Sequence, residues 1–294
     1  MSRPSRTLAA PSIRIGPRTF AWGARTYVMG VINVSPESFS GDGITEPETA
    51  VEQARRFLAE GADILDVGGQ STRPGSNKTE AGFDELAAEE EIRRVVPVIS
   101  GIRRELPDAA ISVDTYKPEV ARAAIDAGAQ MLNDITGLRG GPELAQIAAG
   151  AAVPICLMYN HRGLPAPGGV MPAIVRGLWD AMRAALHAGV DPAHIILDPG
   201  FGFGWTAEQN LEILRDLRAL ENLRAPVLIG TSRKSTIGAA LGGADVHDRT
   251  FGTAATVAIA IAHGADIVRV HDVREMAQVA RVSDAIVRGA GEGR

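Results

Sequence analysis

The chain has 294 residues, 45% of them hydrophobic, which is enough apolar material for one large core. Acidic and basic residues are interspersed without long runs of one sign, and they give a formal net charge of −5. This pattern excludes the concentrated basic surface with which proteins bind nucleic acid or anionic membranes. We therefore expect small-molecule substrates as partners, with no nucleic acid and no membrane.

Targeting and redox features favour the cytoplasm. Residues 1–12 are basic but lack the apolar stretch of a signal peptide, and no apolar run approaches the roughly 18 residues that a membrane span needs. The only cysteine, Cys156, lies in the apolar run 153–158, which is typical of a buried strand and not of a nucleophile or a metal ligand. A single cysteine also excludes a disulfide within the chain.

Short apolar segments alternate with longer amphipathic ones along the chain. Residues 13–25, with turn signals at Gly16-Pro17 and Trp22-Gly23, predict a short hairpin ahead of the first long strand. The strands expected after it are 27–33, 63–67, 110–114, 130–134, 153–158, 194–198, 226–230 and 266–270. The helices expected between them include 47–60, 83–105, 118–127, 171–188, 207–220 and 251–263.

Three of these strands follow a glycine that can end the preceding helix, namely Gly61, Gly128 and Gly264. The recurrence predicts one repeated βα architecture, and about eight such units close into a (β/α)8 TIM barrel. A doubly wound sheet would usually carry a GxGxxG turn after its first strand, and none is there. We expect a tail and hairpin at 1–26, covering the barrel bottom, and a barrel at 27–290.

Polar residues end most of the predicted strands. They are Asn33, Asp66, Asp114, Asn133-Asp134, Tyr159-Asn160, Asp198, Ser232-Arg233-Lys234, Arg269 and His271-Asp272. Strand ends that merely reach solvent would explain two or three polar residues, but not so many carboxylates and amides at one rim. Because barrel enzymes build their active sites at the C-terminal ends of the strands, we expect the active site here.

The segment 198–204, Asp-Pro-Gly-Phe-Gly-Phe-Gly, is the strongest local signal. Its glycines permit close approach of the backbone, and its two phenylalanines offer apolar walls to a flat ligand. Asp114 and Asn133 could join Asp198 in accepting hydrogen bonds from a donor-rich heterocycle. A competing explanation for Asp114 is an N-terminal cap on the helix that begins at Pro118.

Cations and hydroxyls gather in three other motifs. Ser71, Thr72 and Arg73 could hold an anion, although a solvated turn would also explain them. Residues 232–235 and 269–272 add cations and an imidazole at the seventh and eighth strand ends, where such barrels bind phosphate. The six histidines show no metal-binding spacing, so we expect any metal to be Mg²⁺ carried by phosphate oxygens.

Taken together, the motifs resemble those of the dihydropteroate synthase family, whose members are pterin-binding barrels, from about Val28 to the end of the last helix. The segments that carry the resemblance are 30–36 (GVINVSP), 66–69 (DVGG), 71–75 (STRPG), 112–115 (SVDT), 132–134 (LND), 198–204 (DPGFGFG), 232–235 (SRKS) and 269–272 (RVHD). So many segments in this order are hard to obtain by chance.

The resemblance implies that 6-hydroxymethyl-7,8-dihydropterin diphosphate condenses with p-aminobenzoate, giving 7,8-dihydropteroate and diphosphate in folate biosynthesis. The implied mechanism is dissociative: diphosphate leaves, a pterin-methyl cation forms, and the amine attacks it. Such a reaction needs stabilisation of charge and no protein nucleophile. The sequence indeed offers no obvious Ser-His-Asp or Cys-His arrangement. The resemblance also implies Mg²⁺ as cofactor and a homodimer built on the last helices.

Site residues are assigned by the same resemblance. The catalytic residues it implies are Asp114, Lys234, Arg269 and His271. Those implied for the pterin are Asp114, Asn133, Met158, Asp198, Phe203 and Lys234, and those for the diphosphate are Asn33, Thr72, Arg73, Arg269 and His271, with Mg²⁺ at Asn33. Those implied for p-aminobenzoate are Ser71, Thr72, Pro74, Phe201, Lys234 and Ser235.

The chain departs from the family pattern in its loops. Glu37 stands where the family usually has Asp, Gln70 where it has Glu, and Trp205 where Lys is frequent; Gly41-Asp42-Gly43 is reordered, and residues 159–163 form a loop one residue longer, with its histidine displaced. From these departures we predict a variant that tolerates sulfonamides. The alternatives are a non-catalytic pterin-binding paralogue and a pterin-dependent methyltransferase domain, which should lack the STRPG and SRK segments.

Overall fold

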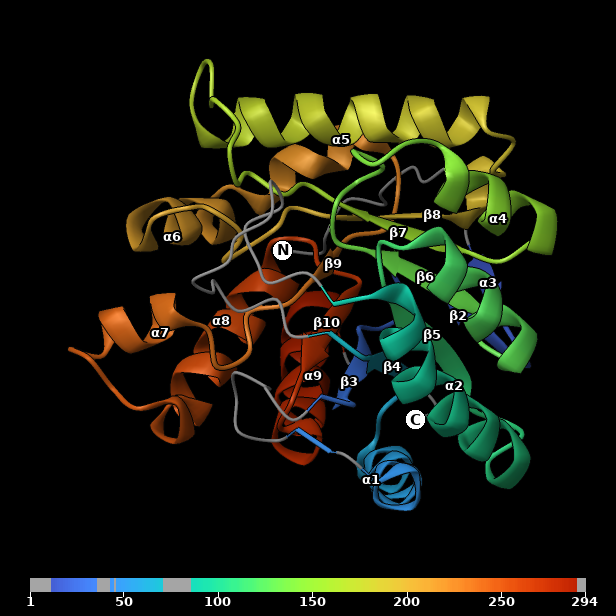
Figure 1. Ribbon diagram of the computed structural model, residues 1–294. Coiled ribbons are helices and arrows are strands. Elements are labelled where there is room, and N and C mark those ends of the chain that lie inside the picture. The colour runs from blue at the N-terminus through green and yellow to red at the C-terminus, as the bar shows by residue number, and fades with distance from the viewer. Residues whose placement is uncertain (1–11, 36–42, 45, 71–85, 290–294) are drawn as a thin grey trace.

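Eight parallel strands lie at the centre of the molecule, and helices surround them (Figure 1). The computed structural model describes residues 12–35, 43–44, 46–70 and 86–289. The strands are β3 (Tyr27–Asn33), β4 (Ile64–Gly68), β5 (Ala110–Asp114), β6 (Met131–Asp134), β7 (Ile155–Met158), β8 (Ile195–Asp198), β9 (Leu228–Ile229) and β10 (Ile267–Val270). Neighbours pair in the order β8-β7-β6-β5-β4-β3-β10-β9, and a parallel bridge between Leu197 and Val227 joins the two ends. The predicted (β/α)8 barrel is confirmed.

Helices follow the strands around the outside of the barrel. They are α1 (Pro47–Glu60), α2 (Ala88–Glu105), α3 (Pro118–Ala127), α4 (Glu143–Ala151), α5 (Val170–His187), α6 (Ala207–Arg215), α7 (Ser235–Ala240), α8 (Thr250–Ala262) and α9 (Val273–Arg288), with 3₁₀ helices η1 (Pro192–His194), η2 (Leu217–Leu223) and η3 (Val246–Asp248). In the described part of the chain, none of the helices combines the length and apolarity that crossing a membrane requires.

One predicted helix is wrong in its second half. The sequence predicts a continuous helix over 207–220, whereas α6 ends at Arg215 and the chain continues as η2. Leu217, Leu220 and Leu223 are the buried residues of η2, and their spacing of three matches the three residues per turn of a 3₁₀ helix. The apolar spacing in this segment therefore fits the tighter helix.

The predicted hairpin closes the bottom of the barrel. Strands β1 (Ser12–Ile15) and β2 (Arg18–Ala21) pair in antiparallel register. Side chains of the hairpin, among them Ile15 and Phe20, belong to one buried cluster with residues at the N-terminal ends of the barrel strands, such as Met29. The hairpin thus supplies apolar cover at the end of the barrel opposite the predicted site. The exact domain limits at 26 and 290 stay a prediction, because residues 1–11 and 290–294 lie outside the described part.

Two of the predicted helix-ending glycines show why the strand ends line up. Gly61 and Gly128 end α1 and α3 in the left-handed conformation, with φ of 109° and 116°. A side chain there would be strained, and at Gly128 it would also meet the Arg103 side chain. These tight helix ends return the chain to the barrel bottom, so each strand finishes at the same rim.

Candidate active site

Parallel register brings three of the predicted site residues into one row. Asn33 of β3 lies beside Gly68 of β4, and Gly68 lies beside Asp114 of β5. Asp114 in turn lies beside Asn133 of β6. On the next pair of strands, Met158 of β7 lies beside Asp198 of β8. The polar strand ends that the sequence analysis singled out therefore meet at one end of the barrel.

Arg269 bridges two carboxylates across this row. Its Nε donates to Oδ2 of Asp66 over 2.6 Å, and its Nη2 donates to Oδ2 of Asp114 over 2.7 Å. Asn133 donates from Nδ2 to the same Asp66 oxygen at 3.0 Å. Asp66 is fully buried, and its Oδ1 has no hydrogen-bond partner among the described residues. The network thus holds the buried Asp66 and the partly buried Asp114 on one guanidinium.

Burial and crowding of negative charge raise the pKa of Asp114 to about 7. Loss of hydration is the main cause, and the nearby carboxylate of Asp66 adds to it, while Arg269 opposes both. The alternative role of Asp114 as a helix cap is wrong. Helix α3 has Lys117 at its N-cap position and no side-chain cap, and the Asp114 carboxylate is bound to Arg269 instead.

Asp66 is a site residue to which the sequence analysis gave no role, although it was noted at a strand end. Its position between Arg269 and Asn133 makes it the acid that orients both side chains. The signal in the sequence is an acid inside an otherwise apolar strand, Ile64–Gly68. Charged groups are rarely buried so completely unless they are paired.

Lys234 lies over the loop that follows β8. Its Nζ donates to the carbonyl of Phe201 and lies 4.7 Å from the centroid of the Phe203 ring. Loss of hydration lowers the pKa of Lys234 to about 7, with Asp198 acting in the opposite direction. Burial likewise raises the pKa of Asp198, whose Oδ1 accepts a hydrogen bond from the Gly200 N–H at 2.7 Å. Burial therefore disfavours the charged form of both side chains.

The two phenylalanines of the glycine-rich loop have different surroundings. Phe203 is half-buried and packs against Met158 and Ile135. The apolar surface of these three side chains, which we call the slot, offers a flat ligand a place to lie. Phe201 is fully buried in the main hydrophobic core. The Phe201 ring has no exposed surface among the described residues, and its contact with p-aminobenzoate stays a prediction.

The predicted anion site is partly described. His271 shares a hydrogen bond of 2.9 Å with Ser232 through Nδ1, and Ser235 is exposed at the first turn of α7. Arg233 pairs with Asp272 through two hydrogen bonds, so this cation is neutralised locally. The predicted residues Ser71, Thr72, Arg73 and Pro74, and the departures Glu37, Gly41 and Asp42, lie outside the described residues.

The metal prediction rests on Asn33. Within the described ranges, no group of three or more His, Cys, Asp or Glu side chains could hold a metal ion. Asn33 is half-buried at the end of β3, and its amide oxygen is a ligand type that Mg²⁺ accepts. One protein oxygen together with phosphate oxygens is a usual Mg²⁺ environment, so the donor set fits a metal that arrives with a diphosphate.

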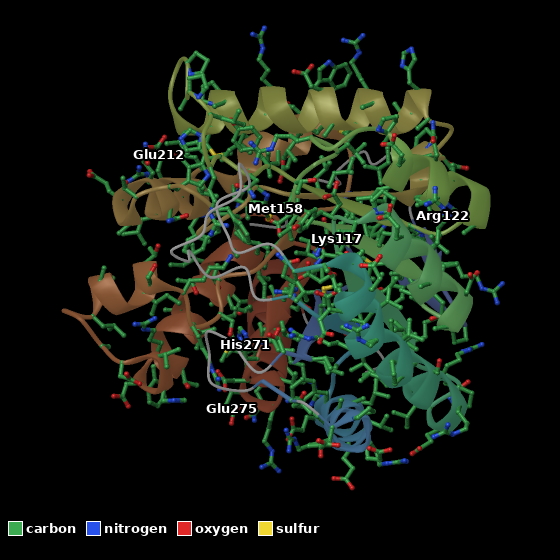
Figure 2. The ribbon with its side chains drawn as sticks, in the orientation of Figure 1. Lys117, Arg122, Met158, Glu212, His271 and Glu275 are labelled. Atoms are coloured by element: carbon green, nitrogen blue, oxygen red, sulfur yellow. The ribbon has the colours of Figure 1, made fainter. Side chains whose placement is uncertain are left out.

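Two hollows bear on where a ligand can enter. A hollow of about 270 Å³ lies next to the slot and is lined by Met158, Tyr159 and Asn160 on one side and by α5 on the other. Met158 lies towards the middle of the molecule in Figure 2, whereas Arg122 lies on its periphery.

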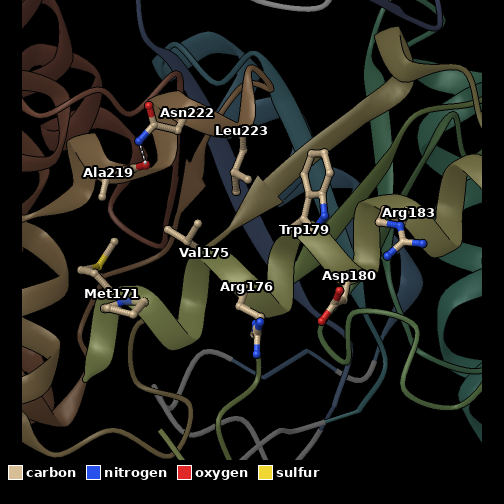
Figure 3. A pocket seen from close by; sticks show the side chains of 10 residues that line it. Met171, Val175, Arg176, Trp179, Asp180, Arg183, Ala219, Asn222 and Leu223 are labelled. Atoms are coloured by element: carbon tan, nitrogen blue, oxygen red, sulfur yellow. Dashed lines mark hydrogen bonds between the residues drawn. The ribbon is translucent and has the colours of Figure 1, made fainter. Parts of the chain in front are cut away.

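A groove of about 660 Å³ runs between α5 and η2 past the half-exposed Trp179, as Figure 3 shows. No strand end lines it, so it is not the active site.

Several residues that hold the loops of the site in place were not predicted from the sequence. Asn210 of α6 accepts from the Gly202 N–H at 2.6 Å and donates to Thr236 of α7 at 3.0 Å, which fixes the loop that carries Phe203. Asn210 is buried on a helix, and only its polarity at an apolar position marked it. On the other side of the rim, Lys117 forms a buried ion pair of 2.5 Å with Glu91.

A closed barrel whose strand ends join buried acids, an amide and two cations beside an apolar slot defines an enzyme for a flat, donor-rich ligand with an anionic group. The sequence model of the pterin binding enzyme family matches residues 29–271. The dihydropteroate synthase of Synechocystis sp. is 46% identical over 286 residues, which cover 95% of this chain and 96% of the relative. The chain therefore belongs to the pterin binding enzymes, in the dihydropteroate synthase family.

Solved structures agree with this assignment. The dihydropteroate synthase of Xanthomonas albilineans with 4-aminobenzoic acid has a TM-score of 0.85 and 38% identity, over 95% of this chain and 98% of that one. The same organism's enzyme in complex with 7,8-dihydropteroate has a TM-score of 0.80 and 36% identity, over 94% and 98% of the two chains. The alternative of a methyltransferase domain is not supported by these relatives.

Proposed function

We propose that the protein condenses 6-hydroxymethyl-7,8-dihydropterin diphosphate with p-aminobenzoate, releasing 7,8-dihydropteroate and diphosphate. The observation that carries the proposal is the set of acceptors at the strand ends, the buried Asn133 and Asp198 and the partly buried Asp114, together with the apolar surface of Met158 and Phe203. A pterin ring is flat and carries amino and ring N–H donors, which match carboxylate and amide oxygens. The related Xanthomonas albilineans structure with 7,8-dihydropteroate supports this choice of product.

Roles in pterin binding follow from the contacts. Asn133 gives its N–H to Asp66, so its carbonyl oxygen is the atom that accepts from the ligand. Asp114 and Asp198 accept the remaining ring donors, and Lys234 donates to a ring acceptor. Met158 and Phe203 give the ring apolar contacts. Since Asp198 is buried and Asp114 partly so, water competes little for these hydrogen bonds.

Charge at the reacting carbon is stabilised by the same acids. When the bond to the diphosphate oxygen breaks, positive charge develops on the pterin methylene, and the carboxylate of Asp114 faces that charge. Arg269 and His271 meet the negative charge on the departing oxygen. The amine of p-aminobenzoate then attacks the methylene and loses a proton. Because these side chains stabilise both the positive and the negative charge, the proposed mechanism needs no nucleophilic side chain.

Mg²⁺ is the proposed cofactor, held by Asn33 and by diphosphate oxygens. When bound, it would supply positive charge that stabilises the leaving group. Asn33 ends β3, the strand that pairs with β4 and its Asp66, so its amide can orient the diphosphate at this rim. An Asn33→Ala variant should need a higher Mg²⁺ concentration for half-maximal rate, and an unchanged requirement would remove Asn33 from this role.

For p-aminobenzoate, we propose a place beside Lys234 and Ser235. The Lys234 ammonium and the Ser235 hydroxyl can both donate to its carboxylate, at the beginning of α7. The structure of the Xanthomonas albilineans relative with 4-aminobenzoic acid supports the choice of this substrate.

A second copy of this chain is the proposed partner. A groove of about 530 Å³ runs between α6, α7 and α8, and its lining is almost wholly apolar. Leu241 and Phe251 beside it are 51% and 89% exposed, which is costly for an isolated chain in water. Sedimentation should find a dimer that a Phe251→Asp variant disrupts, while Leu186→Asp on α5 leaves it intact. A wild-type monomer at every concentration would contradict the proposal.

The remaining expectations concern compartment and drugs. We propose the cytoplasm, since Cys156 is fully buried and the chain gains nothing from an oxidising compartment. We also propose tolerance to sulfonamides, because Trp205 and the loop after β7 depart from the family pattern beside Phe203. The inhibition constant of sulfamethoxazole, compared with that for a sensitive relative, tests it, and equal constants would reject it.

Turnover by purified protein tests the proposed reaction. The protein is given the dihydropterin diphosphate, Mg²⁺ and p-aminobenzoate, and dihydropteroate is separated by chromatography. We expect product from the wild type and none above background from Lys234→Ala or Asp198→Ala, both folded by circular dichroism. Tight pterin binding without product would favour a non-catalytic pterin-binding paralogue.

A further inference from the structure

Two loops at the barrel rim are fastened to each other. Residues 159–169 follow β7, and residues 199–206 follow β8. The backbone N–H of His161 donates to the carbonyl of Phe203 at 3.1 Å. Gly204 has φ of 89°, and a Cβ there would lie 2.7 Å from the Arg162 nitrogen, so only glycine permits this approach. The position of one loop therefore fixes the position of the other.

An aromatic stack holds the same two loops side by side. The rings of His161 and Trp205 are almost parallel, at 5°, with centroids 3.7 Å apart. The Tyr159 ring lies 6.0 Å from Trp205 at an angle of 30°, on the same side of the rim. The Trp205 backbone is held in turn, because its carbonyl accepts a hydrogen bond from Asn210 at 3.3 Å.

Hydrogen bonding does not account for the stacked arrangement. Nδ1 of His161 and Nε1 of Trp205 are buried and have no hydrogen-bond partner among the described residues. Burial, and to a lesser extent Arg139, lowers the pKa of His161 below its usual value, which keeps the imidazole neutral at pH 7. Two neutral rings in face-to-face contact gain dispersion and apolar burial, so stacking is the interaction that stabilises the contact.

The fastened loops carry the Phe203 ring. The Arg162 guanidinium lies 4.9 Å from the centroid of this ring, and the Lys234 ammonium lies 4.7 Å from it. Phe203 also packs against Met158, the other predicted apolar contact of the pterin ring. Arg162 follows His161 directly, and Phe203 is two residues before Trp205. A shift of the stack would therefore move both the ring and one of its cations.

We infer that His161 and Trp205 are positioning residues, which hold the Phe203 ring in its place against Met158 and thereby set the affinity for the pterin ring. The inference rests on the proposed function, since it takes the slot to be the pterin site. Neither stacked ring is assigned a contact with substrate. Both act through Phe203, so their loss should alter pterin binding much more than the chemical step or the binding of p-aminobenzoate.

A double-mutant cycle tests the inference. His161→Ala, Trp205→Ala and the double variant are compared with the wild type by calorimetry with 6-hydroxymethylpterin and by steady-state kinetics. Each single variant should raise the Kd and the KM of the dihydropterin diphosphate about three- to ten-fold, as the loss of one aromatic contact implies. The double variant should be no worse than either single one. The kcat and the KM of p-aminobenzoate should change less than about two-fold.

A rescue variant and a control variant distinguish the positioning of Phe203 from a general loss of structure. Trp205→Phe keeps a ring for the stack and should restore most of the pterin affinity. Trp179→Phe, in the groove of Figure 3, is the matched control and should leave every constant unchanged. Wild-type Kd and KM in both alanine variants, additive losses in the double variant, or equal losses in kcat would overturn the inference. A wild type that neither binds the pterin nor turns over would instead reject the proposed function along with it.

Discussion

The guanidinium of Arg269 on β10 is hydrogen-bonded to the carboxylate of Asp114 on β5, with Nη2 2.7 Å from Oδ2. The same guanidinium holds Asp66 on β4 through Nε. One cation therefore pairs with two acids, the buried Asp66 and the partly buried Asp114, so the network has less positive than negative charge. A substrate that gains positive charge during the reaction would relieve this imbalance, which connects the resting structure to the proposed mechanism.

Replacing Asp114 by Asn should lower activity and raise stability at high pH. The folded pKa of Asp114, about 7, lies above its unfolded value of about 3.9, so stability falls as the pH rises towards and through 7. An Asn side chain carries no charge, so the variant does not lose folding stability in this way as the pH rises. We expect the stability advantage of the variant to be larger at pH 8 than at pH 5 by about 1–3 kcal/mol, measured by urea unfolding.

The same variant should lose about 100-fold or more in kcat/KM for the dihydropterin diphosphate, because the developing cation loses its counter-charge. Asp126→Asn, at an exposed position of α3, is the control and should change neither quantity. An equal stability advantage at both pH values would show that Asp114 does not titrate between them.

Replacing Asn133 by Asp should destabilise the fold. Its Nδ2 donates to Oδ2 of Asp66 at 3.0 Å, so the change removes a donor and sets two buried acids against each other. We expect a loss of about 2–4 kcal/mol in unfolding free energy at pH 8, and a smaller loss at pH 5. Asn222→Asp, exposed on η2, is the control. A loss below about 0.5 kcal/mol would mean that the Asp66 contact contributes little.

Replacing Lys117 by Met should leave Glu91 charged and unpaired in the interior. Glu91 is 1% exposed and lies 2.5 Å from the Lys117 ammonium. Breaking one side of such a pair costs about 3–5 kcal/mol, whereas removing both charges is often close to neutral. We expect Glu91→Leu in the Lys117→Met background to recover most of the loss in chemical denaturation. A double variant as unstable as Lys117→Met alone would assign the loss to packing.

Replacing Phe20 by Ala should separate stability from catalysis. Phe20 is 1% exposed in the hairpin at the barrel bottom, away from the rim that carries the site. The cavity should cost about 3–5 kcal/mol of unfolding free energy. At a temperature where the variant is folded, its kcat/KM should stay within about two-fold of the wild type. A large fall in kcat/KM would show that the bottom of the barrel influences the rim.

Local patterns in the sequence predict most of the fold. Strands of a closed parallel barrel are buried on both sides, so they appear as short apolar runs, and β3, β5, α1 and α3 match the predicted limits. The gathering of polar side chains at one end of the barrel was also predictable, because the C-terminal ends of parallel strands lie at the same rim. The 3₁₀ helix η2 was not, because a run of leucines three apart also fits an α-helix within short windows.

Details of the site depended on contacts between distant residues. Asp66 and Arg269 are 203 positions apart, and nothing local in either segment indicates the pairing. Phe201 and Phe203 occupy equivalent places in one glycine-rich repeat, yet only the course of the loop decides that Phe201 is buried and Phe203 is half-exposed. The stack of His161 on Trp205 likewise joins two loops whose closeness comes from the barrel.

Conversion of labelled p-aminobenzoate into dihydropteroate tests whether the protein catalyses the proposed condensation. Purified protein receives the dihydropterin diphosphate, Mg²⁺ and ring-labelled p-aminobenzoate, and diphosphate and labelled dihydropteroate are measured in the same samples. We expect one diphosphate for each dihydropteroate, with both absent when Lys234 is replaced by Ala. Release of diphosphate with no labelled product, or no release by a wild type that binds the pterin, would contradict it.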